Sequence, residues 1–97
     1  MREWTAAERE ILRTLNEALL EHVPEERFCF APEERDGCMV LAPGEGEWYV
    51  FFREGRLIED VTVHTTLEDA ARQLILNVAP SPEAQEAMQK RFSYYKP

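Results

Sequence analysis

The chain has few of the residues from which catalytic and metal-binding motifs are built. Its 97 residues include two cysteines, two histidines and four glycines. The glycines are scattered among turns, so the sequence has no phosphate-binding glycine loop, and it has no GxSxG or HExxH motif. Eight residues separate Cys29 from Cys38, which is not the CxxC spacing of a metal knuckle. We therefore expect no metal, no cofactor and two reduced, partly buried thiols; a disulfide between neighbouring strands is the alternative.

The histidines and carboxylates do not form a catalytic pattern. His22 falls at the end of an expected helix, where a cation complements the helix dipole. His64 ends an expected strand, beside two threonines. Glu59 and Asp60 are neighbours on that strand, and neighbouring strand side chains point to opposite faces, so these two do not share a proton. The sequence predicts a protein that is not an enzyme and has no catalytic residue; a small enzyme using His64 and a carboxylate is the alternative.

Long hydrophobic runs and basic residues are also scarce. No apolar run approaches the roughly 20 residues needed to cross a bilayer, and the first residues lack the apolar region of a secretory signal. Lysine and arginine total 11 against 19 acidic residues, which gives a net charge of −8. Such a charge disfavours nucleic acid and anionic membranes and suits a basic protein partner, since opposite fields speed association; solubility alone is the other explanation. We expect a cytoplasmic protein that binds another protein.

Hydrophobic residues make up 44% of the chain, which is typical of a folded domain. This length and composition predict one domain spanning residues 1–97. Thr5 followed by Glu8 fits a capping box, and apolar residues then recur at helical spacing as far as Pro24. A helix is therefore predicted over residues 5–22.

Short segments rich in aromatic and β-branched residues follow. They predict strands over residues 27–31, 38–42, 47–53 and 56–64. The connections are a charged loop over 32–37, a Pro-Gly turn over 43–46 and a hairpin turn at Glu54-Gly55. Such short connections favour an antiparallel meander.

Two more helices are predicted after the strands. Thr66, with Asp69 three residues later, caps a helix that ends at Ala79, and Ser81-Pro82 begins the next. The predicted fold class is α+β, with an N-terminal helix, a four-stranded antiparallel meander sheet, and two C-terminal helices packed on one sheet face.

The hairpin also assigns side chains to the two faces of the sheet. If Glu54 and Gly55 form the turn, Phe52 pairs with Leu57 and Trp48 with Val61. One face is then nearly all apolar and should lie against the helices; its members are Trp48, Val50, Phe52, Leu57, Val61 and Val63. The other face has an apolar centre of Val40, Tyr49, Phe51 and Ile58, and a rim of Glu47, Arg53, Arg56 and Asp60. An apolar centre with a polar rim is the anatomy of a protein interface; cover by the C-terminal tail or by a second copy is the alternative.

The segment from Glu47 to Arg56, with the later Thr66-Leu67-Glu68-Asp69-Ala70, resembles small immunity proteins of bacterial polymorphic toxin systems. The shared features are an aromatic strand, a charged glycine hairpin, a second strand and a T-x-E-D-A helix start, within residues 47–76. The resemblance implies a cytoplasmic inhibitor, used in bacterial competition, that occludes the active surface of a basic cognate toxin without doing chemistry. The candidate partner-binding residues are Glu33, Glu34, Asp36, Tyr49, Phe51, Glu54 and Asp60. Aromatic anchors would supply most of the affinity, and the acids would steer the encounter.

A second binding hypothesis is an acidic secretion chaperone for an effector or toxin, because such proteins are also small, α+β and often dimeric. The helix–strands–helix order agrees with it, although no strand is expected after the helix at 66–79. A small ligand-binding protein is a further alternative. Both a monomer and a homodimer are compatible with the sequence.

Overall fold

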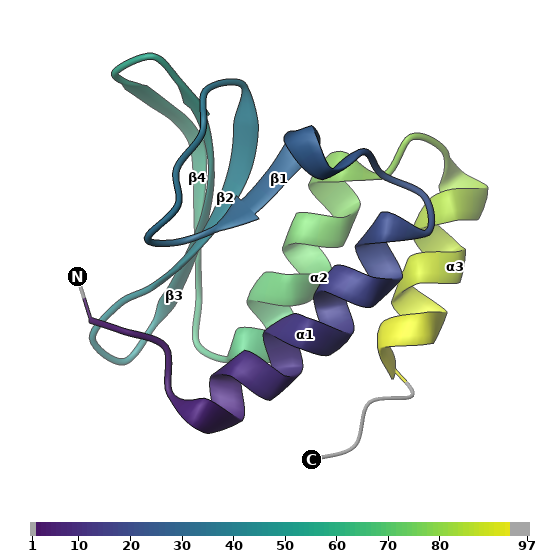
Figure 1. Cartoon of the computed structure of the whole chain (residues 1–97), viewed down its shortest axis with the longest axis horizontal. Coiled ribbons are helices and arrows are strands. Elements are labelled where there is room, and N and C mark those ends of the chain that lie inside the picture. Colours follow the sequence, from purple (N-terminus) through teal and green to yellow (C-terminus); the bar gives the residue numbers. More distant parts are fainter. Residues whose placement is uncertain (1, 94–97) are drawn as a thin grey trace.

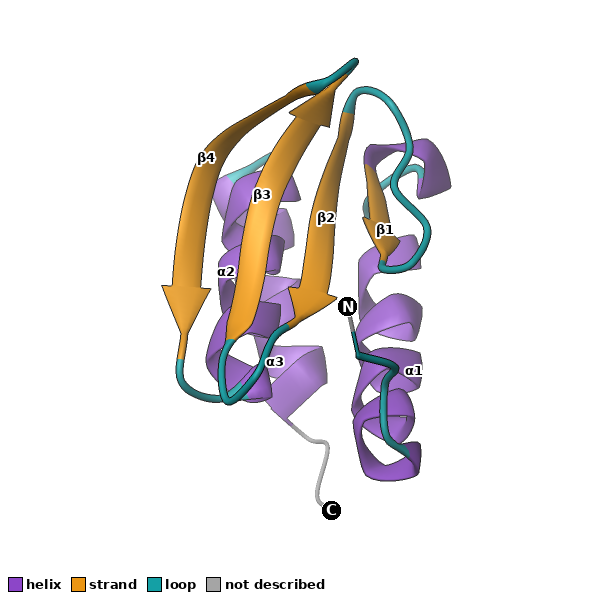
Figure 2. Cartoon of the chain, turned by 90° about the vertical axis from the view of Figure 1, so that its left-hand side faces the viewer, coloured by secondary structure: helices purple, strands orange, loops and turns teal. Residues whose placement is uncertain are grey.

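The computed structural model describes residues 2–93 in two layers, a sheet and a group of helices on one of its faces (Figures 1 and 2). The elements are α1 (Ala6–Leu20), the short 3-10 helix η1 (Glu25–Arg27), β1 (Phe28–Phe30), β2 (Cys38–Pro43), β3 (Trp48–Glu54), β4 (Leu57–His64), α2 (Leu67–Val78) and α3 (Pro82–Ser93). The tail of residues 94–97, one expected cover for the sheet, lies outside the described residues. The predicted α+β class and order of elements are confirmed.

Side chains cap the helices at the predicted positions. The Thr5 hydroxyl accepts a hydrogen bond from the Glu8 N–H, and the Glu8 carboxylate accepts one from the Thr5 N–H. The Thr66 hydroxyl accepts from the Asp69 N–H at 3.0 Å, and Ser81 caps α3 in the same way. Each bond satisfies a backbone donor that has no partner inside the helix.

The main core lies between the sheet and the helices. Its fully buried large side chains include Leu15, Leu19, Leu41, Leu74, Ile75 and Met88. Trp48, Val50 and Phe52 of β3 pack against this core. The predicted alternation along β3 is therefore correct, because every second side chain of that strand contributes to the helix-facing core.

The strands follow the chain in the order β1-β2-β3-β4, but the sheet is mixed. β2, β3 and β4 are antiparallel neighbours, whereas β1 is parallel to β2, with Phe28 beside Met39 and Phe30 beside Leu41. The prediction of a purely antiparallel sheet was therefore wrong. The loop over residues 31–37 returns along the sheet before β2 begins (Figure 2). The residue pattern of a three-residue strand does not reveal this return, because its alternation is the same in either direction.

The hairpin between β3 and β4 turns one residue later than predicted. Glu54 pairs with Leu57, so the central turn residues are Gly55 and Arg56. Only Gly55 of this pair has a positive φ, 59°, which fits a type II′ turn. The tip of the hairpin extends beyond the end of α2 (Figure 2).

A bulge in β4 then places the side chains that follow it on the opposite face of the sheet from the one predicted. Phe52 pairs with Glu59 but Val50 pairs with Thr62, so β4 contains one extra residue in this interval. Asp60 lies in the bulge with a φ of 55°. Because side chains alternate along a strand, the extra residue moves the following side chains to the opposite face. The prediction that Val61 and Val63 face the helices was therefore wrong.

Candidate protein-binding surface

The loop over residues 31–37 covers part of the sheet face opposite the helices, which we call the outer face. A second apolar cluster lies there, formed by the buried residues Cys29, Ala31, Cys38, Val40, Ala42 and Phe51. Val40 is fully buried and Phe51 is 8% exposed. The predicted apolar centre was therefore wrong in treating Val40 and Phe51 as open surface, because both side chains are buried. The charged loop, which the sequence places between two strands, folds over the neighbouring part of the sheet.

A groove of about 410 Å³ remains open on the outer face. It is lined by Glu34, Ala42, Pro43, Tyr49, Phe51, Ile58 and Val61. Three of the candidate partner-binding residues, Glu34, Tyr49 and Phe51, therefore meet in one place. The groove is apolar apart from the Glu34 carboxylate and the Tyr49 hydroxyl, a composition that suits an apolar side chain of another molecule.

Along one side of the groove, β4 presents a row of exposed apolar side chains, which we call the β4 row. It consists of Ile58, Val61 and Val63, which are 52%, 51% and 59% exposed. Val63 pairs with Tyr49 and therefore shares its face, and Val61 lines the groove with Tyr49. The sequence assignment missed two of these three residues because it did not anticipate the bulge. The available signal was Asp60 itself, since Asp tolerates a positive φ better than most residues.

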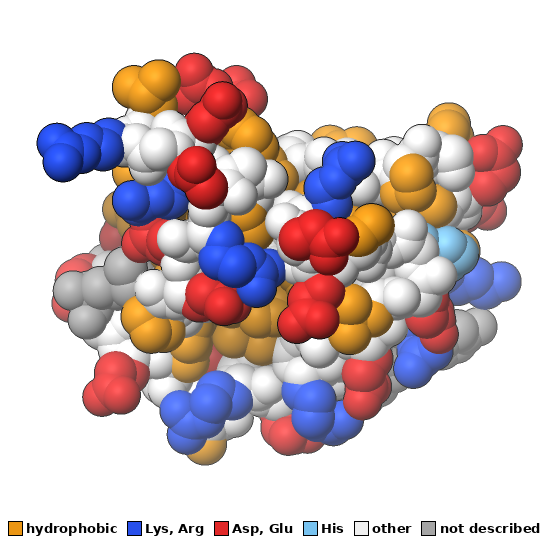
Figure 3. Space-filling model, turned by 45° about the horizontal axis from the view of Figure 1, so that its top comes forward, with side chains coloured by type: hydrophobic (Ala, Val, Ile, Leu, Met, Phe, Trp, Pro, Cys, Tyr) orange, Lys and Arg blue, Asp and Glu red, His pale blue; other side chains and the backbone are white. Residues whose placement is uncertain are grey.

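Charged groups surround the hairpin end of this surface. Glu34 forms an ion pair with Arg53 at 2.6 Å, and Asp36 accepts a hydrogen bond from the Gly55 N–H. The candidate residues Glu54 and Asp60 are exposed. Figure 3 shows acidic and apolar side chains side by side at this end of the sheet. The ion pair and the Asp36 bond tie the loop to the hairpin and so hold the groove in shape.

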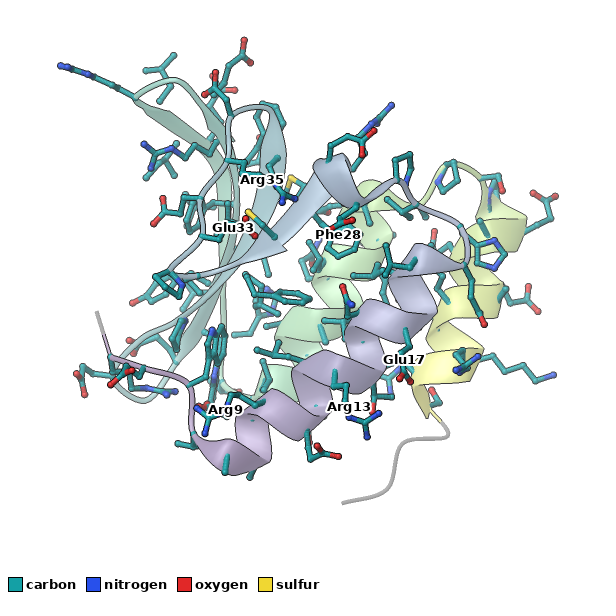
Figure 4. All side chains as sticks on the ribbon, viewed as in Figure 1. Arg9, Arg13, Glu17, Phe28, Glu33 and Arg35 are labelled. Atoms are coloured by element: carbon teal, nitrogen blue, oxygen red, sulfur yellow. The ribbon has the colours of Figure 1, made fainter. Side chains whose placement is uncertain are left out.

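Glu33 is the candidate residue that the structure places elsewhere. Its carboxylate lies 3.3 Å from Arg35, on the η1 and β1 side of the loop (Figure 4). Arg35 donates to the backbone carbonyls of Glu25 and Phe28 at 2.6 and 2.5 Å. Glu33 and Arg35 therefore anchor the loop to the preceding turn, and Glu33 does not line the groove.

Tyr49 is positioned by its neighbours in the β2–β3 turn. Its hydroxyl donates to the Glu47 carboxylate at 3.0 Å, and this bond raises the pKa of Tyr49 above its ordinary value. Gly44 leaves room for the ring, because a Cβ at that position would lie 2.5 Å from Tyr49 Cε2. A half-buried aromatic side chain held in this way loses little conformational entropy on binding a partner.

The two cysteines meet inside the second apolar cluster. Their Sγ atoms are 3.1 Å apart, and both residues are buried and free. Burial raises the pKa of the Cys38 thiol to about 12, with the Cys29 thiol adding to the shift and Arg35 opposing it. A thiol with such a pKa is not a useful nucleophile near neutral pH. Within residues 2–93, no group of three or more His, Cys, Asp or Glu residues could hold a metal ion.

Glu8 is a buried acid whose role in the structure the sequence only partly indicated. Its carboxylate accepts two hydrogen bonds from Arg2, at 2.7 and 2.8 Å, and one from the indole of Trp48 at 2.9 Å. Arg2 also donates to the carbonyl of Gly44 at 2.7 Å. This network joins the start of α1 to β3 and to the β2–β3 turn, so it supports the strand that carries Tyr49.

Comparison with protein-family models, with curated proteins and with solved structures finds no match for the chain. Along residues 2–93 no helix combines the length and the apolar character needed to cross a membrane. Function is therefore inferred from the outer face and from the charge of the chain.

Proposed function

We propose that this protein is a binding protein that neutralises a cognate bacterial toxin by covering its active surface with the outer face of the sheet. The observation that carries the proposal is the β4 row, three half-exposed aliphatic side chains beside an apolar groove that contains Tyr49. A contiguous apolar surface with a charged border is the usual composition of a protein interface.

The charge of the protein supports a basic partner. The chain carries a net charge of −8, and Glu34, Asp36, Glu54 and Asp60 border the outer face or lie at its hairpin end. A basic toxin would be attracted and oriented by these acids, which mainly affects the association rate. Tyr49 and the aliphatic row would then exclude water at the centre, which mainly affects the dissociation rate.

Inhibition of this kind needs no chemical step by the protein itself. A bound partner has part of its own surface buried, and its substrate cannot reach an active site within that area. The groove would receive one apolar side chain of the partner, while the β4 row, which forms one side of the groove, would extend the contact along the strand. Two of the candidate residues, Tyr49 and Glu34, would contact the partner at the groove.

The experiment is co-expression with the protein encoded beside this one in its genome. We expect the pair to co-purify, and we expect cells that die from the neighbouring protein alone to survive when both are made. Unchanged cell death in the presence of the intact chain would exclude an immunity function.

The contact surface is tested with a matched pair of variants. Val61→Ser combined with Val63→Ser should weaken binding at least about tenfold, because two apolar contacts are lost. Leu76→Ser is the control, since Leu76 is a similarly exposed aliphatic residue on α2, on the helix side of the sheet. We expect the control to retain wild-type affinity; equal losses in the two variants would exclude the outer face as the contact.

A further inference from the structure

β4 lies at the edge of the sheet, and within residues 2–93 it has a neighbouring strand on one side only. The sheet order gives it β3 alone, and among residues 2–93 no backbone hydrogen bond joins β4 to any other segment. A strand in this position exposes backbone N–H and C=O groups that another extended segment can pair with.

The geometry of the hairpin identifies one of the free backbone groups. In a two-residue hairpin the pair that closes the turn is hydrogen-bonded, and here that pair is Glu54 and Leu57. The next pair, Arg53 and Ile58, is therefore not hydrogen-bonded. The direction of the Arg53 carbonyl is consistent with this, because it accepts a hydrogen bond from the Gly37 N–H at 2.7 Å, on the β2 side of the strand. The N–H and C=O of Ile58 consequently point away from the sheet.

Beyond the bulge, the same reasoning shows that the backbone N–H and C=O of Val63 also point away from the sheet. The Val50 carbonyl accepts from the Thr62 hydroxyl at 3.4 Å and so faces β4. Backbone groups alternate in direction along β3, so those of the next residue, Tyr49, face β2. Val63, the partner of Tyr49, therefore directs its N–H and C=O outward. Ile58 and Val63 thus offer both free backbone groups and exposed aliphatic side chains.

Acidic residues on β4 and at the end of β3 favour a basic segment as the added strand. Glu54, Glu59 and Asp60 are exposed, and within the described chain none of them forms an ion pair. A second copy of β4 laid antiparallel about the centre of the strand would bring Glu59 and Asp60 of both copies together. Like charges in neighbouring strands are destabilising, so this pairing is unfavourable. An extended segment with basic residues fits this edge better than a second copy does.

We propose that the partner binds by adding an extended segment, with alternating aliphatic and basic residues, along the free edge of β4. The segment pairs with the backbone of Ile58, of Val63 or of both, and its aliphatic side chains lie beside the β4 row. Its basic side chains meet Glu54, Glu59 and Asp60. This proposal rests on the proposed function, because it specifies how the toxin contacts the same surface.

The test is residue-resolved amide hydrogen exchange by NMR, with the protein free and in complex with the product of the neighbouring gene. In the free protein we expect the amides of Ile58 and Val63 to exchange fast, because they point to solvent. In the complex we expect at least one of them to slow by about 100-fold or more, as hydrogen-bonded strand amides do. A complex that leaves both amides fast overturns strand addition but preserves the proposed function, whereas absence of any complex overturns both.

Two controls complete the experiment. Exchange in the free protein is repeated at several concentrations, and protection of Ile58 that rises with concentration would assign the edge to a second copy and overturn the proposal. Ile58→Pro removes the outward N–H, and an outward N–H on an edge strand is one that proline can replace. Ile58→Ala keeps the N–H and shortens the side chain. We expect proline to weaken binding more than alanine, whereas the reverse order would indicate side-chain contact alone.

Discussion

Glu8 and Trp48 are 40 residues apart in the chain, yet the Trp48 indole N–H donates to the Glu8 carboxylate at 2.9 Å. The bond joins the first turn of α1 to the first residue of β3. Arg2 binds the same carboxylate through two nitrogens. A single buried acid therefore connects the N-terminal segment, the first helix and the sheet.

Glu8 should make stability depend on pH in the acid range. The hydrogen bonds from Arg2, aided by those from Thr5 and Trp48, lower the pKa of Glu8 from 4.5 to about 2. A depressed pKa in the folded state gives stability that is fully present above pH 4.5 and is lost as the pH falls toward 2. The contribution is about 3 kcal/mol at neutral pH.

Urea unfolding of wild type and Glu8→Gln checks this prediction. The variant should be less stable at pH 7, because Arg2 loses its charged partner, and the difference between the two proteins should shrink steadily below pH 4.5. A difference that stayed constant between pH 7 and pH 2 would show that the ionised carboxylate is not what stabilises the fold.

The bulge at Asp60 gives a second prediction. A φ of 55° is in the left-handed region, which is strained for β-branched residues and relaxed for glycine. Asp60→Val should therefore destabilise the protein by about 1–3 kcal/mol, whereas Asp60→Gly should change the unfolding free energy by less than about 1 kcal/mol. Chemical denaturation measures both variants, and a valine variant as stable as the glycine variant would argue against the bulge.

The sequence predicted those parts of the fold that depend on local patterns. Thr5, Thr66 and Ser81 marked the helix starts, and the alternation along β3 placed Trp48 toward the helices correctly. The direction of β1 could not be read, because it depends on the path of a loop held by Arg35 through bonds to distant carbonyls. These are tertiary contacts without a periodic signal.

The candidate surface was predictable only where it follows from the local alternation of strand side chains. Tyr49 and Ile58 were assigned to the outer face correctly, since the strand period of two holds as far as Glu59. Val61 and Val63 were misassigned, because one extra residue at Asp60 reverses every later position of the strand. The error hid the most exposed apolar part of the outer face.

The cysteines should resist modification in the folded protein. Both thiols are buried, and burial raises the pKa of Cys38 to about 12, so its thiolate is scarce near neutral pH. We expect alkylation by iodoacetamide at pH 8, followed by mass spectrometry, to be slow in native buffer and fast in urea. Rapid double labelling of the native protein would show that the loop over residues 31–37 does not shield the second apolar cluster.

Trp48 and Tyr49 are neighbours on β3, and their side chains point to opposite faces of the sheet, so their replacement should separate stability from binding. Trp48 packs against the main core and donates a hydrogen bond to Glu8. Trp48→Ala should therefore destabilise the protein by about 3–5 kcal/mol. Tyr49 lines the groove, so Tyr49→Ala should cost about 1–2 kcal/mol of stability but should weaken partner binding at least tenfold. Thermal unfolding and titration calorimetry with the neighbouring gene product measure the two effects.

Tyr49→Phe is the matched control, because it keeps the ring and loses only the hydrogen bond to Glu47. If the alanine variant bound as tightly as wild type, the groove would not be part of the contact. A loss shared equally by both Tyr49 variants would assign the affinity to the hydroxyl and not to the ring.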